Sequence, residues 1–150
     1  RRTGELAFVT NEPSNKYRTN YLQVSSNVAT MDLSLHGNPL VIISCYLPHD
    51  AVLQHIQPKR TAAWDELHDT INKTTEAKNL IVCGDFNAAL HHRKEGEEDV
   101  VGQHVFGKGR QFLETQEDRT PDNFRDNREH LIAITRATST VIANTFSEKH

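Results

Sequence analysis

Residues 28–47 contain two apolar segments joined by a turn, and this pair limits the folds open to the chain more than any other feature. In residues 28–36 apolar and polar side chains alternate, which is the pattern of a half-buried β-strand. Residues 40–47 are apolar on both faces until Ser44, which is typical of a central strand. The segment between them supplies turn chemistry, His36-Gly37-Asn38-Pro39. We therefore expect a β-hairpin whose second strand lies inside a sheet.

The alternation in the first of these strands predicts which side chains share a face. One face is expected to be polar, with Thr30, Asp32 and Ser34. The other is expected to be apolar, with Ala29, Met31, Leu33 and Leu35.

Further strands are expected at residues 6–10, 17–24, 79–86 and 141–144. A helix is expected over residues 59–75, because Pro58 is a helix-start residue and Trp64, Leu67 and Ile71 recur at spacings of three and four. These elements interleave, and with the hairpin signals they predict an α/β or α+β domain with a mixed or antiparallel sheet.

A second helix is expected to begin at Asp126. Asp126 and Glu129 have the spacing of a capping box. The inner stripe of this helix would then consist of Leu131, Ile134 and Ala137.

Composition excludes several classes of protein. The 150 residues fit one domain, and 17 basic against 20 acidic residues leave a net charge of -3, which argues against a polybasic nucleic-acid arm. No apolar run is long enough for a membrane span or a signal peptide, so no membrane partner is expected. Cys45 and Cys83 lie in apolar stretches, which predicts buried, reduced thiols and an intracellular location. Residues 94–99 and the pair His91-His92 are expected in solvated loops.

The strongest chemical signal is an apolar strand that runs into Gly84-Asp85-Phe86-Asn87. Strand alternation would project Asp85 and Asn87 to one side and turn Phe86 into the core. Gly84 would permit close approach of a substrate or another strand. A carboxylate can take a proton from water or hold a cation, and an amide can donate to a phosphate oxygen. An Asx-type turn explains the same two side chains equally well.

A second signal lies at Ser44-Cys45-Tyr46-Leu47-Pro48-His49. The phenol of Tyr46 could reach a neighbouring site while its ring packs against the strand. Taken alone, Tyr46 is better explained by capping the core, and His49 by a solvated loop.

These segments together resemble the endonuclease/exonuclease/phosphatase superfamily. The resemblance rests on Gly84-Asp85-Phe86-Asn87-Ala88, on the upstream tyrosine strand, and on Trp64-Asp65 between them. Residues 126–132 and 141–146 narrow it, because they are similar to the endonuclease domains of LINE-type retrotransposon polyproteins and their domesticated relatives.

The resemblance implies a four-layered α/β sandwich, with two mixed, largely antiparallel sheets flanked by helices. It implies Mg²⁺-dependent hydrolysis of phosphodiesters, DNA as the partner, and a nuclear location. Tyr46 would contact the scissile phosphate, and Asp85 would orient or deprotonate the attacking water and be a metal ligand. Asn87 would stabilise the transition state, and His49 would contact substrate phosphate where many relatives have asparagine.

The remaining family residues are not matched. Glu5 and Glu12 lack the context of the family's metal-binding glutamate, and His150 lacks the aspartate that precedes the family's last histidine. We therefore expect residues 1–150 to be a single incomplete domain, the central fragment of a DNA-nicking endonuclease, and inactive alone. The alternatives are a phosphatase or another phosphodiesterase on the same fold, or a non-catalytic remnant or interaction module.

Overall fold

The structure is a computed structural model that describes residues 16–49, 57–74, 79–88, 90, 93–105 and 122–147. The chain divides into two compact units. The first comprises residues 1–48 and 53–86, and the second comprises residues 49–52 and 87–150. The prediction of one incomplete domain stays a prediction.

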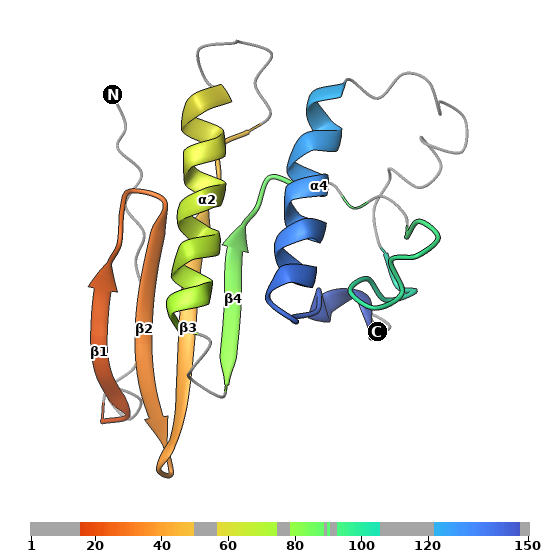
Figure 1. The fold of residues 1–150 in the computed structure, drawn as a ribbon. Coiled ribbons are helices and arrows are strands. Elements are labelled where there is room, and N and C mark those ends of the chain that lie inside the picture. Colours follow the sequence, from red (N-terminus) through yellow and green to blue (C-terminus); the bar gives the residue numbers. More distant parts are fainter. Residues whose placement is uncertain are drawn as a thin grey trace. The chain divides into compact units, whose positions relative to one another are not determined.

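The first unit is built on a four-stranded mixed sheet in the order β1-β2-β3-β4 (Figure 1). Its first three strands are antiparallel neighbours, and β4 runs parallel to β3 after the crossover through helix α2. The strand bounds are Arg18–Gln23 for β1, Val28–Leu35 for β2, Asn38–Tyr46 for β3 and Leu80–Asp85 for β4. The predicted strands in these four regions are confirmed, and β3 is central, as expected.

A hairpin turn joins β2 to β3, as expected, but it is shorter than the predicted segment 36–39, because Asn38 and Pro39 already belong to β3. Leu35 pairs with Asn38, so only His36 and Gly37 lie in the loop. Both have positive φ, 52° and 81°. Two positive φ values in a two-residue loop are typical of a type I′ hairpin, in which the turn twist matches that of the strands.

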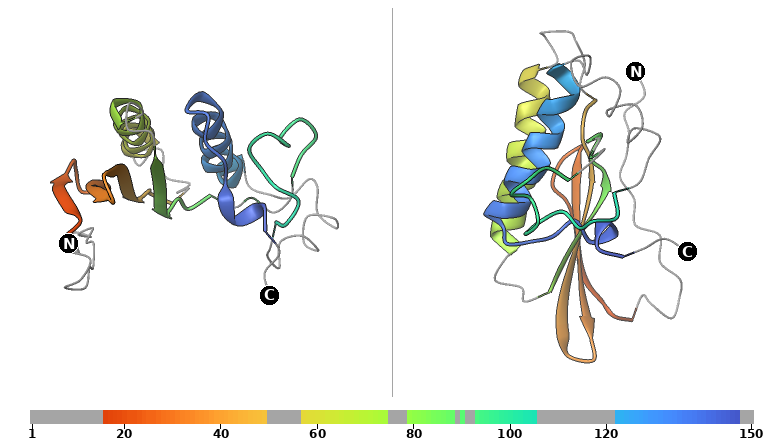
Figure 2. Two further views of the ribbon diagram at one scale, coloured as in Figure 1. Left: turned by 90° about the horizontal axis from the view of Figure 1, so that it is seen from below. Right: turned by 90° about the vertical axis from the view of Figure 1, so that its right-hand side faces the viewer.

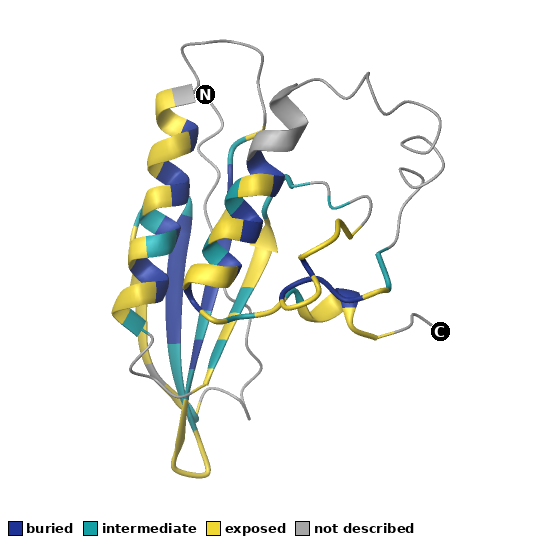
Figure 3. Ribbon diagram, turned by 45° about the vertical axis from the view of Figure 1, so that its right-hand side comes forward, coloured by how far each residue is buried: buried dark blue, intermediate teal, exposed yellow. Residues whose placement is uncertain are grey.

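Helix α2, Gln57–Thr74, covers one face of this sheet (Figure 2). Trp64, Leu67 and Ile71 are each at most 2% exposed, which confirms the predicted stripe. On this face of the sheet, Ile43 and Cys45 of β3 are buried and belong to the core with the helix. Figure 3 shows buried stretches on both the sheet and the helix.

The prediction of a half-buried β2 is wrong for its first half. Val28, Ala29, Thr30 and Met31 are all buried, so both faces are covered there. Thr30 is 8% exposed and pairs with Ile43, so it lies on the face beneath α2. A polar residue type did not indicate an exposed position here.

The second unit contains helix α4, Asp122–Ala137, and a short 3-10 helix η1, Ala143–Thr145. The predicted start at Asp126 is wrong, because Asp126 already lies inside the helix. The Pro121 that precedes Asp122 in the sequence is a helix-start signal that the capping-box interpretation overlooked.

The inner stripe of α4 also differs from its prediction. Leu131 is buried as expected, but Ile134 is half-buried and Ala137 is exposed. Among residues 127–137 of the helix, the buried side chains are Asn127, Arg128, Leu131, Ile132 and Thr135. Ile132 packs with Val100 and Val101 in the hydrophobic cluster of this unit.

The predicted strand at residues 141–144 is wrong. Ile142 makes one isolated parallel bridge to Val101, and η1 follows directly. The hydroxyl of Thr145 donates to the Ile142 carbonyl at 2.6 Å and accepts from the Gly102 amide at 2.7 Å. The hydrogen bond to Ile142 is local, and the one from Gly102 joins residues 43 positions apart. Together they hold the turn that follows the single bridging residue.

The described residues therefore form a mixed α+β structure with one four-stranded mixed sheet and two α-helices. The strand predicted at residues 6–10 and the pair His91-His92 lie outside the described residues. No helix in the described part of the chain is long and apolar enough to cross a membrane.

Candidate functional site

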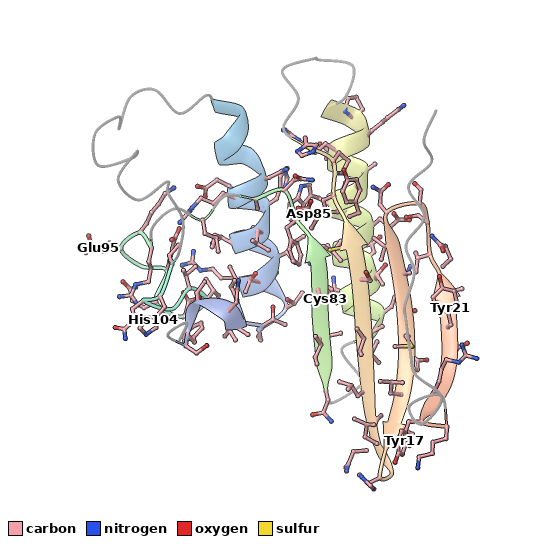
Figure 4. All side chains as sticks on the ribbon, turned by 180° about the vertical axis from the view of Figure 1, so that it is seen from behind. Tyr17, Tyr21, Cys83, Asp85, Glu95 and His104 are labelled. Atoms are coloured by element: carbon pink, nitrogen blue, oxygen red, sulfur yellow. The ribbon has the colours of Figure 1, made fainter. Side chains whose placement is uncertain are left out.

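Tyr46 and Asp85 lie opposite each other at the ends of β3 and β4. They are Cα partners in the parallel register, so their side chains project from the same face of the sheet. Because Trp64 of α2 stacks on Phe86, the residue after Asp85, that face is the one opposite the helix. Tyr46 is 44% exposed, and Asp85 is exposed at the tip of β4 (Figure 4). A phenol and a carboxylate thus share one exposed strand end.

Phe86 takes the orientation that alternation predicts. Its ring stacks on Trp64 with 6.5 Å between centroids and 27° between planes. Trp64 is 1% exposed, so this contact ties the end of β4 to the helix-covered core.

Gly84 is required by the closeness of β3 to β4. A Cβ at this position would lie 1.9 Å from the Cys45 carbonyl oxygen, and φ is +141°. Only glycine tolerates both conditions without displacement of the neighbouring strand. The close approach expected at Gly84 is therefore that of another strand, and it sets the spacing of the strands just before Asp85.

The backbone of Tyr46 is held by Asn27, a residue that our sequence analysis missed. The Asn27 side-chain amide donates to the Tyr46 carbonyl at 2.7 Å, and the Tyr46 amide donates to the Asn27 carbonyl at 2.9 Å. Ser25 accepts from the Asn27 amide at 2.9 Å and donates to Glu66 of α2 at 2.5 Å. The sequence Ser25-Ser26-Asn27 has the composition of a turn, but turn composition does not predict that Asn27 hydrogen-bonds to Tyr46 on β3.

Asn87 and His49 belong to the second unit. Strand β4 ends at Asp85, and Asn87 has φ +46°, so strand alternation no longer places the Asn87 side chain beside Asp85. Its carbonyl accepts a hydrogen bond at 3.1 Å from the side chain of Asn127, which is fully buried on α4. His49 is exposed. The roles expected for both residues stay predictions.

The two cysteines differ in environment, and the prediction of two buried thiols is wrong for one of them. Cys45 is buried, whereas Cys83 is exposed on the same sheet face as Asp85 (Figure 4). Burial, with the nearby Cys83 and Asp85 adding to it, raises the pKa of Cys45 to about 12. Cys45 therefore stays a neutral thiol and is no candidate nucleophile.

The expectation that residues 94–99 are an exposed loop is wrong for Glu97. Glu97 is 6% exposed, and its two oxygens accept from the guanidinium of Arg128 at 2.7 and 2.5 Å. Burial alone would raise the pKa of Glu97, but the hydrogen bonds from Arg128 and from the Lys94 amide outweigh it, so the pKa is lowered. This bidentate pair joins the loop to α4.

The described residues contain no group of three or more histidine, cysteine, aspartate or glutamate side chains that could hold a metal ion. Asp85 remains the one sequence-predicted ligand among them. Comparison of the chain with protein-family models, with curated proteins and with solved structures gives no match.

Proposed function

We propose that this chain belongs to a Mg²⁺-dependent phosphodiesterase that nicks DNA, with Tyr46, Asp85 and Asn87 in its active site. The observation that carries the proposal is the pairing of Tyr46 with Asp85 on one exposed face at the carboxyl ends of two parallel strands. In open sheets that contain a parallel crossover, ligands bind beyond the carboxyl ends of the strands.

The chemistry of these groups suits phosphodiester hydrolysis. The Asp85 carboxylate would accept a proton from the attacking water, which is general-base catalysis. The Tyr46 phenol would donate a hydrogen bond to a non-bridging phosphate oxygen, and the Asn87 amide would donate to the charge that develops there. These donors act where negative charge grows in the transition state.

Asp85 also fits the proposed cation. Mg²⁺ keeps several waters and takes one or two carboxylates from a protein, so a single exposed aspartate can be one of its ligands. The ion would supply Lewis-acid stabilisation of the phosphate oxygens. The remaining ligands would come from residues other than those described.

We further propose that the sheet of the first unit is one half of a two-sheet, four-layered sandwich. The face opposite α2 is also apolar, with Met31, Ile42 and Ile81 on successive strands. Met31 is 5% exposed, whereas Ile81 at the β4 end of this face is 49% exposed. Strands that are apolar on both faces are typical of a sheet with a layer on each side.

The test is nicking of supercoiled plasmid by the product of the complete reading frame that contains these 150 residues. In the presence of Mg²⁺, Asp85→Ala should lose about 10²- to 10⁴-fold in rate, because the water loses its base. The control is Asp69→Ala, which removes an exposed aspartate from α2 and should leave the rate unchanged.

Three outcomes would reject the proposal. Nicking by Asp85→Ala at the wild-type rate would remove the mechanism. Release of phosphate from a monoester without nicking would favour the phosphatase. No hydrolysis of either substrate by the complete product would favour a non-catalytic interaction module.

A further inference from the structure

Asn127 lies on α4, 40 residues from Asn87, and contacts it inside the second unit. Its side chain is 0% exposed, and its Nδ2 donates to the Asn87 carbonyl oxygen at 3.1 Å. A buried amide is costly unless it is hydrogen-bonded, so this contact accounts for part of what keeps a polar residue in the interior.

Asn87, whose carbonyl accepts this hydrogen bond, has an unusual backbone conformation. Asn87 has φ +46°, in the left-handed region, which L-residues adopt at a cost and asparagine tolerates better than most. Rotation about this residue would move both its carbonyl and its side chain. A hydrogen bond to the carbonyl therefore restrains the direction in which the Asn87 amide projects.

Asn127 is itself firmly held. The next residue, Arg128, is 5% exposed and makes the bidentate pair with Glu97. Ile132, a little more than one turn further on, is 4% exposed and packs with Val101. The donor therefore comes from a part of α4 that buried contacts fix on two sides, and it has only two side-chain torsions to order.

We propose that Asn127 is a positioning residue, which holds Asn87 in its left-handed conformation so that the Asn87 amide is aimed at the substrate phosphate. This inference rests on the proposed function for its consequence in catalysis. Its structural part, the control of Asn87 by Asn127, stands separately, and the two parts are tested by different measurements.

The structural part is tested by NMR on the 150-residue chain. In the wild type, the side-chain amide protons of Asn127 should exchange slowly, and the backbone coupling of Asn87 should report a positive φ. In Asn127→Asp, studied at a pH at which the new carboxylate is ionised, the shape is kept and the donor is removed, so the Asn87 signals should shift while those of Val101 stay in place. Ala133→Asp, which adds the same charge on the exposed side of α4, should shift neither.

The catalytic part is tested with the complete reading-frame product. Asn127→Asp should lower kcat by roughly 10²-fold, because a small displacement of a catalytic group costs that much. KM should stay unchanged, since an interaction made only in the transition state is lost. Ala133→Asp should retain the wild-type kcat.

Each outcome decides between the parts. Fast exchange of the Asn127 amide protons in the wild type, or an unshifted Asn87 in Asn127→Asp, would overturn the positioning role whatever the rates are. A KM increase with unchanged kcat would overturn the claim that Asn127 aims the Asn87 amide at the substrate phosphate. A wild type that hydrolyses nothing, with the NMR result as expected, would refute the proposed function and leave the control of Asn87 intact. Should Asn127→Asp fail to fold, Asn127→Ser removes the amide without burying a charge.

Discussion

Gly84→Ala is the perturbation whose size the structure defines best. The added Cβ would lie 1.9 Å from the Cys45 carbonyl oxygen, where real Cβ atoms stay beyond 3.0 Å, so β3 and β4 must separate locally by about 1 Å. The atoms nearest to the added Cβ are all backbone atoms of Cys45, so no side-chain rotation relieves the contact. Forcing extra atoms into a packed site costs about 1–3 kcal/mol. The φ of +141° adds roughly 1–3 kcal/mol of backbone strain.

Gly37→Ala is the matched control in the same unit. Gly37 also has a positive φ, +81°, but a Cβ there meets nothing within 4 Å. It should therefore show the cost of strain without the cost of crowding. The difference between the two variants contains the cost of the close approach of the strands and the difference in strain between φ +141° and φ +81°, and we expect the close approach to contribute about 1–3 kcal/mol to the free energy of unfolding.

The assay is urea unfolding followed by tryptophan fluorescence. Trp64 is the single tryptophan, is 1% exposed, and stacks on Phe86, two residues after Gly84. With an m-value of roughly 1–3 kcal/mol per molar urea, a difference of about 2 kcal/mol moves the midpoint by about 1 M. Equal midpoints for Gly84→Ala and Gly37→Ala would refute the claim that crowding at Cys45 requires glycine.

Two further predictions concern charge and thiol chemistry. Glu97→Gln removes the bidentate carboxylate from the buried Arg128, which keeps the longer contact to Glu129 at 3.5 Å. It should destabilise the second unit by about 3–5 kcal/mol, seen as faster hydrogen exchange at Val101, whose amide donates to the Glu97 carbonyl. The pKa of Glu97 is lowered on folding, so its ionised form stabilises the second unit above the ordinary pKa of 4.5, and this stabilisation is lost as the pH falls through the lower folded value. The corresponding loss of stability in acid should be absent in Glu97→Gln. A Glu97→Gln variant with the same pH dependence of stability as the wild type would contradict this role of Glu97. Iodoacetamide at neutral pH should modify Cys83 alone in the native chain and both cysteines in urea, and native labelling of Cys45, whose pKa is about 12, would disprove its burial.

The local elements of the first unit could be predicted because their signals are local. The turn at His36 and Gly37 requires positive φ at adjacent positions, and that requirement is met by the residue types themselves. The stripe of Trp64 and Leu67 follows from helical periodicity, and the inward direction of Phe86 follows from strand alternation. Each of these predictions needs only neighbours a few residues away.

The candidate site could be predicted only as a set of residue types. Tyr46 and Asp85 were identified by their positions after apolar strands, but their pairing depends on the register of two strands that are 39 residues apart. A shift of one residue would have sent one of the two side chains to the opposite face. Gly84 predicted a close approach, but not that the approaching group is the Cys45 backbone, which is 39 residues away along the chain.

The sequence by itself determined where strands and helices form in the first unit, and which side chains bring acid, amide and phenol chemistry. Only the tertiary structure decided which polar side chains are buried and paired. Glu97 stands in a charged stretch that has the composition of a solvated loop, yet it is buried against Arg128. Cys83 lies in an apolar strand, yet it is exposed. The physical reason is that desolvation and pairing depend on which distant groups meet, whereas periodicity and turn chemistry depend on neighbours along the chain.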